Sequence, residues 1–192
     1  MENFPSDRVS ATQQNIPATT ASDPVMTATG EFIDTTVDLE LGGPLPLLFG
    51  RHYGALLGAA AQARGFYGQA DSPMGTNWVH NFHILLRRVD ATNLRVSYYR
   101  GATVWFAKSG SAWTMAQPSG GIFRGMPYQM IESAGKFKFI DPDQEKVFTF
   151  DGAGLTDGTV RPVESIADRN GNTHTLVYNG DGTLKTVSDG AG

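Results

Sequence analysis

Two stretches in the C-terminal third of the chain share one pattern: FTFDGAGL at residues 148–155 and LVYNGDGTL at residues 176–184. In each, an aromatic residue is followed by Asp or Asn, then by glycines, then by Leu. Tight hairpin turns favour Asp, Asn and Gly, because these residues reach positive φ or bond their own backbone. The aromatic and the Leu supply an apolar face that can pack on a neighbouring unit. The pattern predicts strands joined by short turns and repeated along the chain.

A second element alternates with the first. A β-branched residue precedes an acidic turn three times, at IDPD (residues 140–143), IADRNG (166–171) and VSDGAG (187–192). The repeating unit is therefore a strand, an acidic turn, a strand that ends in an aromatic residue, an Asn/Asp-Gly turn and a further strand. Phe150-Asp151 and Tyr178-Asn179 end the aromatic strands, and Gly182 and Leu184 complete the second unit.

Alternating apolar residues predict strands in the rest of the chain. Val37, Leu39 and Leu41 are expected on one face of a strand. The clearest hairpin pairs residues 136–140 with 147–150 across the turn at 141–144, so that two Phe pairs face each other. Residues 54–64 favour helix by composition and could form a short helix or a loop. The predicted fold is an all-β, mainly antiparallel meander with at most that one short helix.

The amino-acid composition excludes several classes of protein and of functional site. The chain has 192 residues, of which 40% are hydrophobic and 18% charged, and its net charge is −4. These values are too apolar for a disordered chain and too acidic for a typical nucleic-acid binder. The absence of cysteine excludes disulfides, thiolate metal sites and cysteine nucleophiles. No apolar run is long enough to span a bilayer, and the first residues lack the pattern of a secretory signal peptide.

Several motifs together resemble the rearrangement-hotspot (Rhs, or YD-repeat) family. Tyr178-Asn179 stands where the family has its tyrosine-aspartate pair, and Phe150-Asp151 is a more degenerate copy. The stretch GTNWVHNF at residues 75–82, with Trp78, His80 and Asn81, is similar to a Gly-x-x-Trp-x-His-Asn signature of the module that precedes the repeats. The stretches DPV (23–25), TGEF (29–32), GPLPL (43–47) and RHY (51–53) also resemble that module.

The resemblance implies a structural function. Family members wrap a β-ribbon into a hollow shell around a C-terminal toxin domain, and bacteria deliver many of them into competing cells by type VI secretion or a related route. The implied partners are the rest of the shell, the toxin domain, and a secretion spike protein or a chaperone. The expected location is the bacterial cytoplasm, followed by export without the Sec pathway. The expected division is a disordered leader (1–22), a β-rich N-terminal module (23–155) and the first, truncated repeats (156–192).

No catalytic, cofactor-binding or metal-binding residues are predicted. On a continuous strand, His80 and His83 would point to opposite faces, so they are not expected to chelate one ion. In that interpretation His80 and Asn81 satisfy backbone groups beside Trp78. The acidic turn at 141–145 is expected to be solvated rather than catalytic. The turns at 168–172 and 179–182 lack the ligand spacing of a calcium loop.

The main alternative is a cell-surface or wall-associated module that binds carbohydrate or protein. A row of exposed aromatic residues would favour it, namely Tyr98, Tyr99, Trp105, Phe106 and Trp113; their alternation instead indicates core or shell-lining positions. The side chains expected to be buried are those of Val37, Leu39, Leu41, Trp78, Phe82, Phe137, Phe139, Phe148, Phe150, Tyr178 and Leu184.

Overall fold

The computed structural model describes residues 25–26, 31–55, 57, 74–98, 102–116 and 128–190. The expected leader (1–22) and most of the segment expected as a helix or loop (54–64) lie outside these residues. Within that segment, Gly54 ends a strand, and residues 55 and 57 are in turns.

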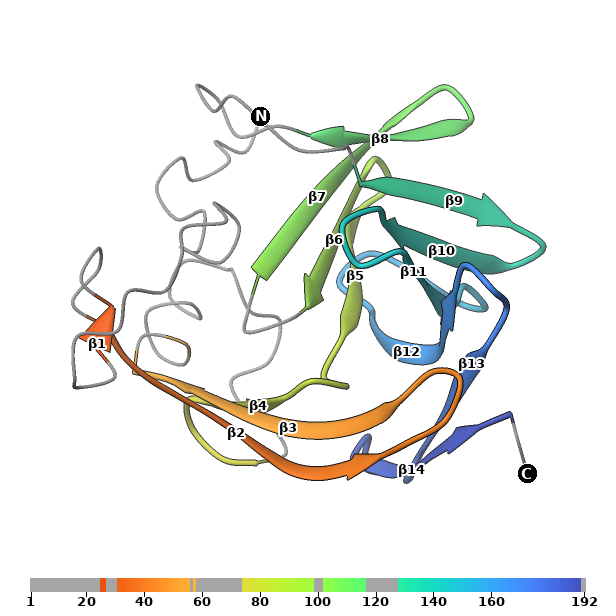
Figure 1. Cartoon of the computed structure of the whole chain (residues 1–192). Helices are drawn as coiled ribbons and strands as arrows, with labels where there is room; N and C mark the ends of the chain where they lie inside the picture. Colours follow the sequence, from red (N-terminus) through yellow and green to blue (C-terminus); the bar gives the residue numbers. More distant parts are fainter. Residues whose placement is uncertain are drawn as a thin grey trace.

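The described chain is all-β and antiparallel, as the sequence predicts, and forms two sheets (Figure 1). The first sheet has the order β1-β2-β3-β4. The second contains β5 to β14. The strands are β1 (Val25–Met26), β2 (Glu31–Leu41), β3 (Leu47–Gly54), β4 (Trp78–His80), β5 (Leu85–Asp90), β6 (Asn93–Tyr98), β7 (Ala102–Ser109), β8 (Ala112–Ala116), β9 (Gln129–Ser133), β10 (Lys136–Asp141), β11 (Lys146–Asp151), β12 (Val160–Asp168), β13 (Thr173–Tyr178) and β14 (Leu184–Asp189).

Eight strands of the second sheet form a closed ring. Strands β5 to β11 follow one another as antiparallel neighbours, and β12 pairs with both ends of that series. Its first residues pair with β5, from Val160 with Arg87 to Pro162 with Leu85. From Val163 onward, β12 pairs with β11. A ring of about eight strands leaves an interior that side chains can fill.

The strands of the ring supply most of the hydrophobic core. The predicted hairpin has the expected register, with Phe137 opposite Phe150 and Phe139 opposite Phe148. All four rings are buried, as predicted, and so is Phe82. The buried cluster consists of Phe82, Ile84, Leu86, Leu94, Val96, Val104, Phe106, Trp113, Met130, Phe137, Phe139, Phe148, Phe150, Leu155, Val163, Ile166 and Leu176.

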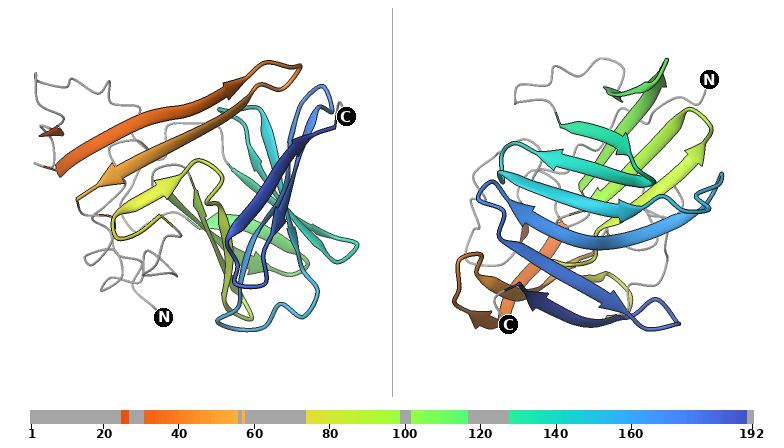
Figure 2. Two further views of the ribbon diagram at one scale, coloured as in Figure 1. Left: turned by 90° about the horizontal axis from the view of Figure 1, so that it is seen from below. Right: turned by 90° about the vertical axis from the view of Figure 1, so that its right-hand side faces the viewer.

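The β2–β3 hairpin lies outside the ring (Figure 2), and here the burial prediction is wrong. Val37, Leu39 and Leu41 are 56%, 47% and 49% exposed. They also do not share a face: the register shifts between Val37 and Leu39, so Val37 lies opposite Gly50 and Leu39 opposite Phe49. Because residues on successive positions of β3 point to opposite faces, this bulge at Asp38 places Val37 on the other face from Leu39 and Leu41.

Strand β12 also carries the next hairpin. Beyond its contact with β5, the same strand pairs with β13, from Ser165 with Thr175 to Ala167 with Thr173. Strand β13 in turn pairs with β14. The expected boundary between residues 155 and 156 thus falls just before β12, a strand that completes the ring and starts the outer hairpin.

Gly152 directly follows β11 and lies close to the backbone of Gly135, which directly precedes β10. A Cβ atom built there would lie 2.7 Å from the carbonyl oxygen of Gly135 and 3.0 Å from the ring of Phe137. We expect Gly152→Ala to lower the free energy of unfolding by about 1–3 kcal/mol, because neither neighbour can move without disturbing the sheet. Urea unfolding measures this loss. Gly180→Ala is the matched control, since a Cβ at Gly180 meets nothing within 4 Å, and an equal loss in both variants would contradict the prediction.

Candidate functional site

The Trp78–Phe82 segment joins the two sheets. Strand β4 pairs with β3, and the chain then turns, with the backbone N–H of His83 donating to the carbonyl of His80 (2.9 Å). Asn81 continues the pairing through its side chain: its Oδ1 accepts from the backbone N–H of Gly50 (3.0 Å), and its Nδ2 donates to the carbonyl of Leu48 (2.8 Å). The prediction that His80 and Asn81 satisfy backbone groups is confirmed for Asn81, whereas Nδ1 of His80 is buried without a hydrogen-bond partner among the described residues. The signature asparagine therefore acts as a side-chain extension of the sheet.

Asn81→Ala removes both hydrogen bonds and leaves the Gly50 N–H and the Leu48 carbonyl without these partners. We expect the free energy of unfolding to fall by about 1–3 kcal/mol, the usual cost of leaving such groups unsatisfied. Chemical denaturation measures the change, with Gln129→Ala as control because Gln129 is exposed on β9. A difference below about 0.5 kcal/mol between the two variants would count against this role of Asn81.

Trp78 forms a layered contact on the face of β3 and β4. Burial was predicted for Trp78, but the side chain is half-buried. It lies on the four-stranded sheet, beside two residues of β3. The guanidinium carbon of Arg51 lies 5.4 Å from the Trp78 ring centre, and the Tyr53 ring lies 5.2 Å away. Arg51 also donates two hydrogen bonds to Asp38, of 2.6 and 2.9 Å, which raise the pKa of Arg51. The sequence alone does not predict this ion pair, because it depends on the register of the β2–β3 hairpin.

Two histidine rings meet beneath the hairpin. His80 is 6% exposed, stacks on Phe49 at 5.5 Å and contacts His83 edge-on at 5.7 Å between ring centres. The expectation that these histidines point to opposite faces is wrong, because β4 ends at His80 and the turn brings the rings together. Burial lowers the pKa of each to about 4, and His83 adds a repulsive contribution at His80. Both imidazoles are therefore neutral at pH 7.

The β13–β14 hairpin contacts the tip of the β2–β3 hairpin. His174, buried on β13, lies with its Nε2 3.0 Å from the carbonyl oxygen of Leu45, and its ring packs edge-on against Phe82 at 6.2 Å. A Cβ built at Gly43 would lie 3.5 Å from a carboxylate oxygen of Asp189. Residues of the expected N-terminal module and of the expected first repeat thus share one contact region, which we call the seam (Leu45, Phe49, His80, Phe82 and His174).

The two repeat-like units, residues 148–155 and 176–184, lie in different parts of the fold. Phe150 is fully buried inside the ring. Tyr178 is half-buried, as is Leu184, so full burial was wrongly predicted for both. They lie on the outer hairpin, packed against the rim of the core. The Tyr178 hydroxyl donates to the carbonyl of Val163 (2.9 Å) and so ties β13 to the ring strand β12.

Side chains form hydrogen bonds within the turns, as the sequence predicts. Asp151 accepts from the backbone N–H of Ala153 (3.3 Å) and from Lys136 (3.1 Å). In the second unit, the backbone N–H of Gly182 donates to the carbonyl of Asn179 (3.0 Å), with Gly182 at a φ of 84°. The side chain of Asn179 donates to the hydroxyl of Thr183 (2.8 Å).

The acidic turns use their carboxylates in the same way. Asp168 accepts from the backbone N–H groups of Asn170 and Asn172 and from the Asn172 side chain, at 2.7–2.9 Å. Asp141 is 1% exposed, so the expectation that this turn is solvated is wrong for Asp141. Its oxygens accept from the backbone of residues 143 and 144 and from the Gln144 side chain. Both carboxylates are occupied in holding their turns.

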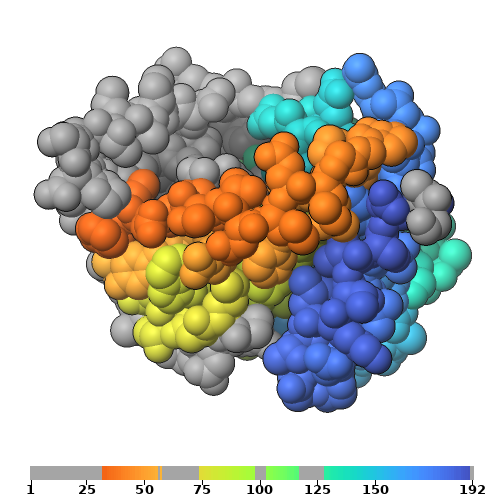
Figure 3. Space-filling model, turned by 60° about the horizontal axis from the view of Figure 1, so that its bottom comes forward, coloured from red at the N-terminus to blue at the C-terminus, as the bar shows by residue number. Residues whose placement is uncertain are grey.

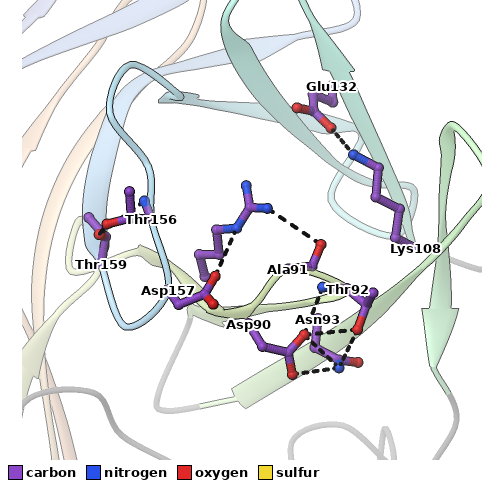
Figure 4. A network of polar contacts seen from close by, with 10 residues as sticks. Asp90, Ala91, Thr92, Asn93, Lys108, Glu132, Thr156, Asp157 and Thr159 are labelled. Carbon is purple, nitrogen blue, oxygen red and sulfur yellow. Dashed lines mark hydrogen bonds and ion pairs between the residues drawn. The ribbon is translucent and has the colours of Figure 1, made fainter.

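A polar network fixes one end of the ring (Figure 4). Arg88 lies 3.4 Å from Asp157 and Lys108 lies 3.1 Å from Glu132, while Asp90 accepts from Thr92 and Asn93. Glu132 also accepts from the indole of Trp113 (2.9 Å), and this hydrogen bond is the main reason why the pKa of Glu132 is lowered. Within the described residues, no group of three or more His, Cys, Asp or Glu side chains could hold a metal ion.

The aromatic row of the binding-module alternative is divided by the structure. Phe106 and Trp113 are buried in the ring. Trp105 is half-buried, with the Arg95 guanidinium 5.5 Å from its ring centre. The side chain of Tyr98 and all of Tyr99 lie outside the described residues. No helix in the described chain is long and apolar enough to cross a membrane.

These features define an all-β protein with an eight-stranded ring, turns held by side-chain hydrogen bonds, and an outer hairpin that continues from β12 and contacts the β2–β3 hairpin at the seam. A domain whose family is described as "Domain of unknown function (DUF6531)" is found at residues 22–106. The match includes β1 to β6, the Trp78–Phe82 segment and most of β7. No match to a curated protein is found.

Proposed function

We propose that this chain is the N-terminal structural part of a rearrangement-hotspot shell, which encloses a C-terminal toxin and helps to deliver it in competition between bacteria. The DUF6531 domain at residues 22–106 contains the Trp78–Phe82 signature on which the resemblance partly rests. In this proposal the chain is not an enzyme. The polar side chains described above stabilise turns and the seam.

The observation that carries the proposal is the outer hairpin. Strand β13 leaves the closed ring along β12, and among the described strands β14 pairs with β13 alone. Its outer edge therefore presents backbone N–H and C=O groups on which a further strand can be added. A closed ring that leads into an extendable sheet is the arrangement needed to anchor a β-ribbon shell at one end.

The mechanism is steric enclosure. Repeated hairpins can stack through their aromatic and Leu side chains, while side-chain-closed turns keep each reversal short. The proposed partners are the remaining shell and the toxin domain, with a secretion spike protein or a chaperone during export. The proposed location is the bacterial cytoplasm before export by a route other than Sec.

Electron cryo-microscopy of the full-length gene product tests the proposal. We expect later residues to add a strand to the outer edge of β14 and the following sheet to surround an internal space that holds a separate C-terminal domain. Limited proteolysis of the same sample should leave that domain intact until the shell is opened by denaturant. A product whose β14 edge faces solvent, or whose C-terminal domain is cut as fast as an unenclosed control, would overturn the proposal.

A further inference from the structure

Two asparagines of the chain directly precede a glycine, Asn170 and Asn179. An Asn-Gly pair can lose its side-chain amide without an enzyme, because glycine has no Cβ atom to hinder attack of its backbone nitrogen on the asparagine side chain. These asparagines and the glycines that follow them are all exposed. Solvent access therefore does not distinguish the two pairs, and a difference in reactivity has to come from the backbone.

In the first pair, the glycine nitrogen is engaged in closing a turn. The turn consists of residues 168–171, and the backbone N–H of Gly171 donates to the carbonyl of Asp168 (3.2 Å). The Asp168 carboxylate also accepts from the backbone N–H of Asn170 (2.8 Å). For the Gly171 nitrogen to attack the Asn170 side chain, the turn would first have to open.

In the second pair, the glycine nitrogen does not close the turn. The turn consists of residues 179–182, and the backbone N–H of Gly182 donates to the carbonyl of Asn179 (3.0 Å). Gly180 is the second residue of this turn, and its N–H has no hydrogen-bond acceptor among the described residues. A Cβ atom built at Gly180 would meet nothing within 4 Å. The turn projects from the rim of the fold in Figure 2, and Figure 3 shows the C-terminal strands (blue) at the surface.

We propose that Asn179 is a site of spontaneous deamidation in the folded protein and that the turn at Asp168 protects Asn170. The backbone nitrogen of Gly180 attacks Cγ of Asn179 and loses its proton, while Nδ2 leaves as ammonia, so that a cyclic imide forms. Water then opens this ring. Opening at Cγ gives aspartate, and opening at the main-chain carbonyl gives isoaspartate, in which the chain continues through Cγ. The inference does not rest on the proposed shell function.

Either product changes the β13–β14 hairpin. The Nδ2 of Asn179 donates to the hydroxyl of Thr183 (2.8 Å), and that hydroxyl donates to Asp181 (2.7 Å). A carboxylate at position 179 cannot donate to Thr183, and it adds a negative charge near Asp181. Isoaspartate also lengthens the main chain where the N–H of residue 179 donates to the carbonyl of Thr183 (2.8 Å). The pairing that leads into β14 is therefore weakened.

Peptide mapping by mass spectrometry tests the proposal. The chain is incubated at mildly alkaline pH in water enriched in heavy oxygen and then digested in ordinary water, so that the label marks deamidation that precedes digestion. In the folded chain, we expect the rate at Asn179 to exceed that at Asn170 by about fivefold or more, the factor that corresponds to one lost backbone hydrogen bond. In the urea-unfolded chain, the two rates should agree within about twofold, because both asparagines precede glycine.

Two variants separate the chemistry from the stability of the fold. Gly180→Ala places a methyl group in open space, so it should slow deamidation at Asn179 by about fivefold or more while the chain stays folded. Asp168→Ala removes the carboxylate that holds the first turn. The loosened turn should raise the rate at Asn170 by about threefold or more and leave the rate at Asn179 unchanged. Circular dichroism checks that each variant is folded.

Three results would overturn the proposal. The first is an equal rate at Asn170 and Asn179 in the folded chain. The second is the same ratio of the two rates in the folded and the unfolded chain, which would assign the difference to local sequence rather than to the turns. The third is an unchanged rate at Asn179 in the Gly180→Ala variant, which would exclude attack by the Gly180 nitrogen.

Discussion

Phe139→Ala is expected to lower the free energy of unfolding by about 3–5 kcal/mol. The Phe139 ring is fully buried and lies 5.4–6.0 Å from the rings of Phe106, Tyr128 and Phe148. Truncation of a buried Phe to Ala costs about 3–5 kcal/mol, because apolar contact is lost and a cavity remains. That loss is a large part of the net stability of a typical domain, about 5–15 kcal/mol.

Urea unfolding followed by tryptophan fluorescence measures this effect. Ile131→Ala is a suitable control, because Ile131 lies on neighbouring β9 but is 44% exposed, and its truncation should cost less than about 1 kcal/mol. Phe139→Leu should fall between the two variants, since it retains most of the apolar volume. Similar unfolding midpoints for Phe139→Ala and Ile131→Ala would show that the ring interior is not the source of stability.

Mild acid is expected to destabilise the fold through the buried histidines His80 and His83. The pKa of His80 and of His83 is lowered to about 4, mainly by burial, so the folded chain binds fewer protons than the unfolded chain between pH 6.5 and 4. The contribution of these histidines to the free energy of unfolding is therefore fully present above about pH 6.5, and it falls as the pH decreases from 6.5 to 4. A single imidazole with this shift contributes a loss on the order of 3 kcal/mol by pH 4.

Urea unfolding at several pH values from 7.5 to 4.5 tests this dependence. The pKa values of Asp90, Glu132 and Asp168 are lowered by hydrogen bonds, so their contribution is lost mainly below the histidine window. His80→Phe keeps an aromatic ring against Phe49 without a titrating group and should make the dependence shallower. A flat profile above pH 4.5 in the unmodified chain, or an unchanged slope in His80→Phe, would refute this assignment.

Local features were predictable from the sequence. The β10–β11 hairpin has the expected register because Phe137, Phe139, Phe148 and Phe150 alternate around a turn that Asp141 closes. The side-chain bonds in the Asp168 and Asn179 turns follow from residue types that bond their own backbone. In each case the sequence signal and the contact lie within a few residues of each other.

Features that depend on distant parts of the chain were not predictable in the same way. The bulge at Asp38 reverses the face of Val37, and no residue pattern in β2 marks it. The contact between His80 and His83 exists because β4 ends where the chain turns toward β5, whereas a continuous strand was expected. Closure of the ring joins Leu85 to Pro162, and neither residue carries a local signal for that partner.

The late position of β12 has a consequence for synthesis. A chain made from its N-terminus exposes β5 to β11 before the strand that completes the ring has been made. Until β12 emerges, the growing sheet has two unpaired edges and an uncovered aromatic face, which are the features that favour aggregation. Pairing of β5 with β12 is also a long-range contact, and such contacts slow folding. Ribosome-bound chains that end before residue 160 should therefore associate with chaperones, and release should coincide with the emergence of β12.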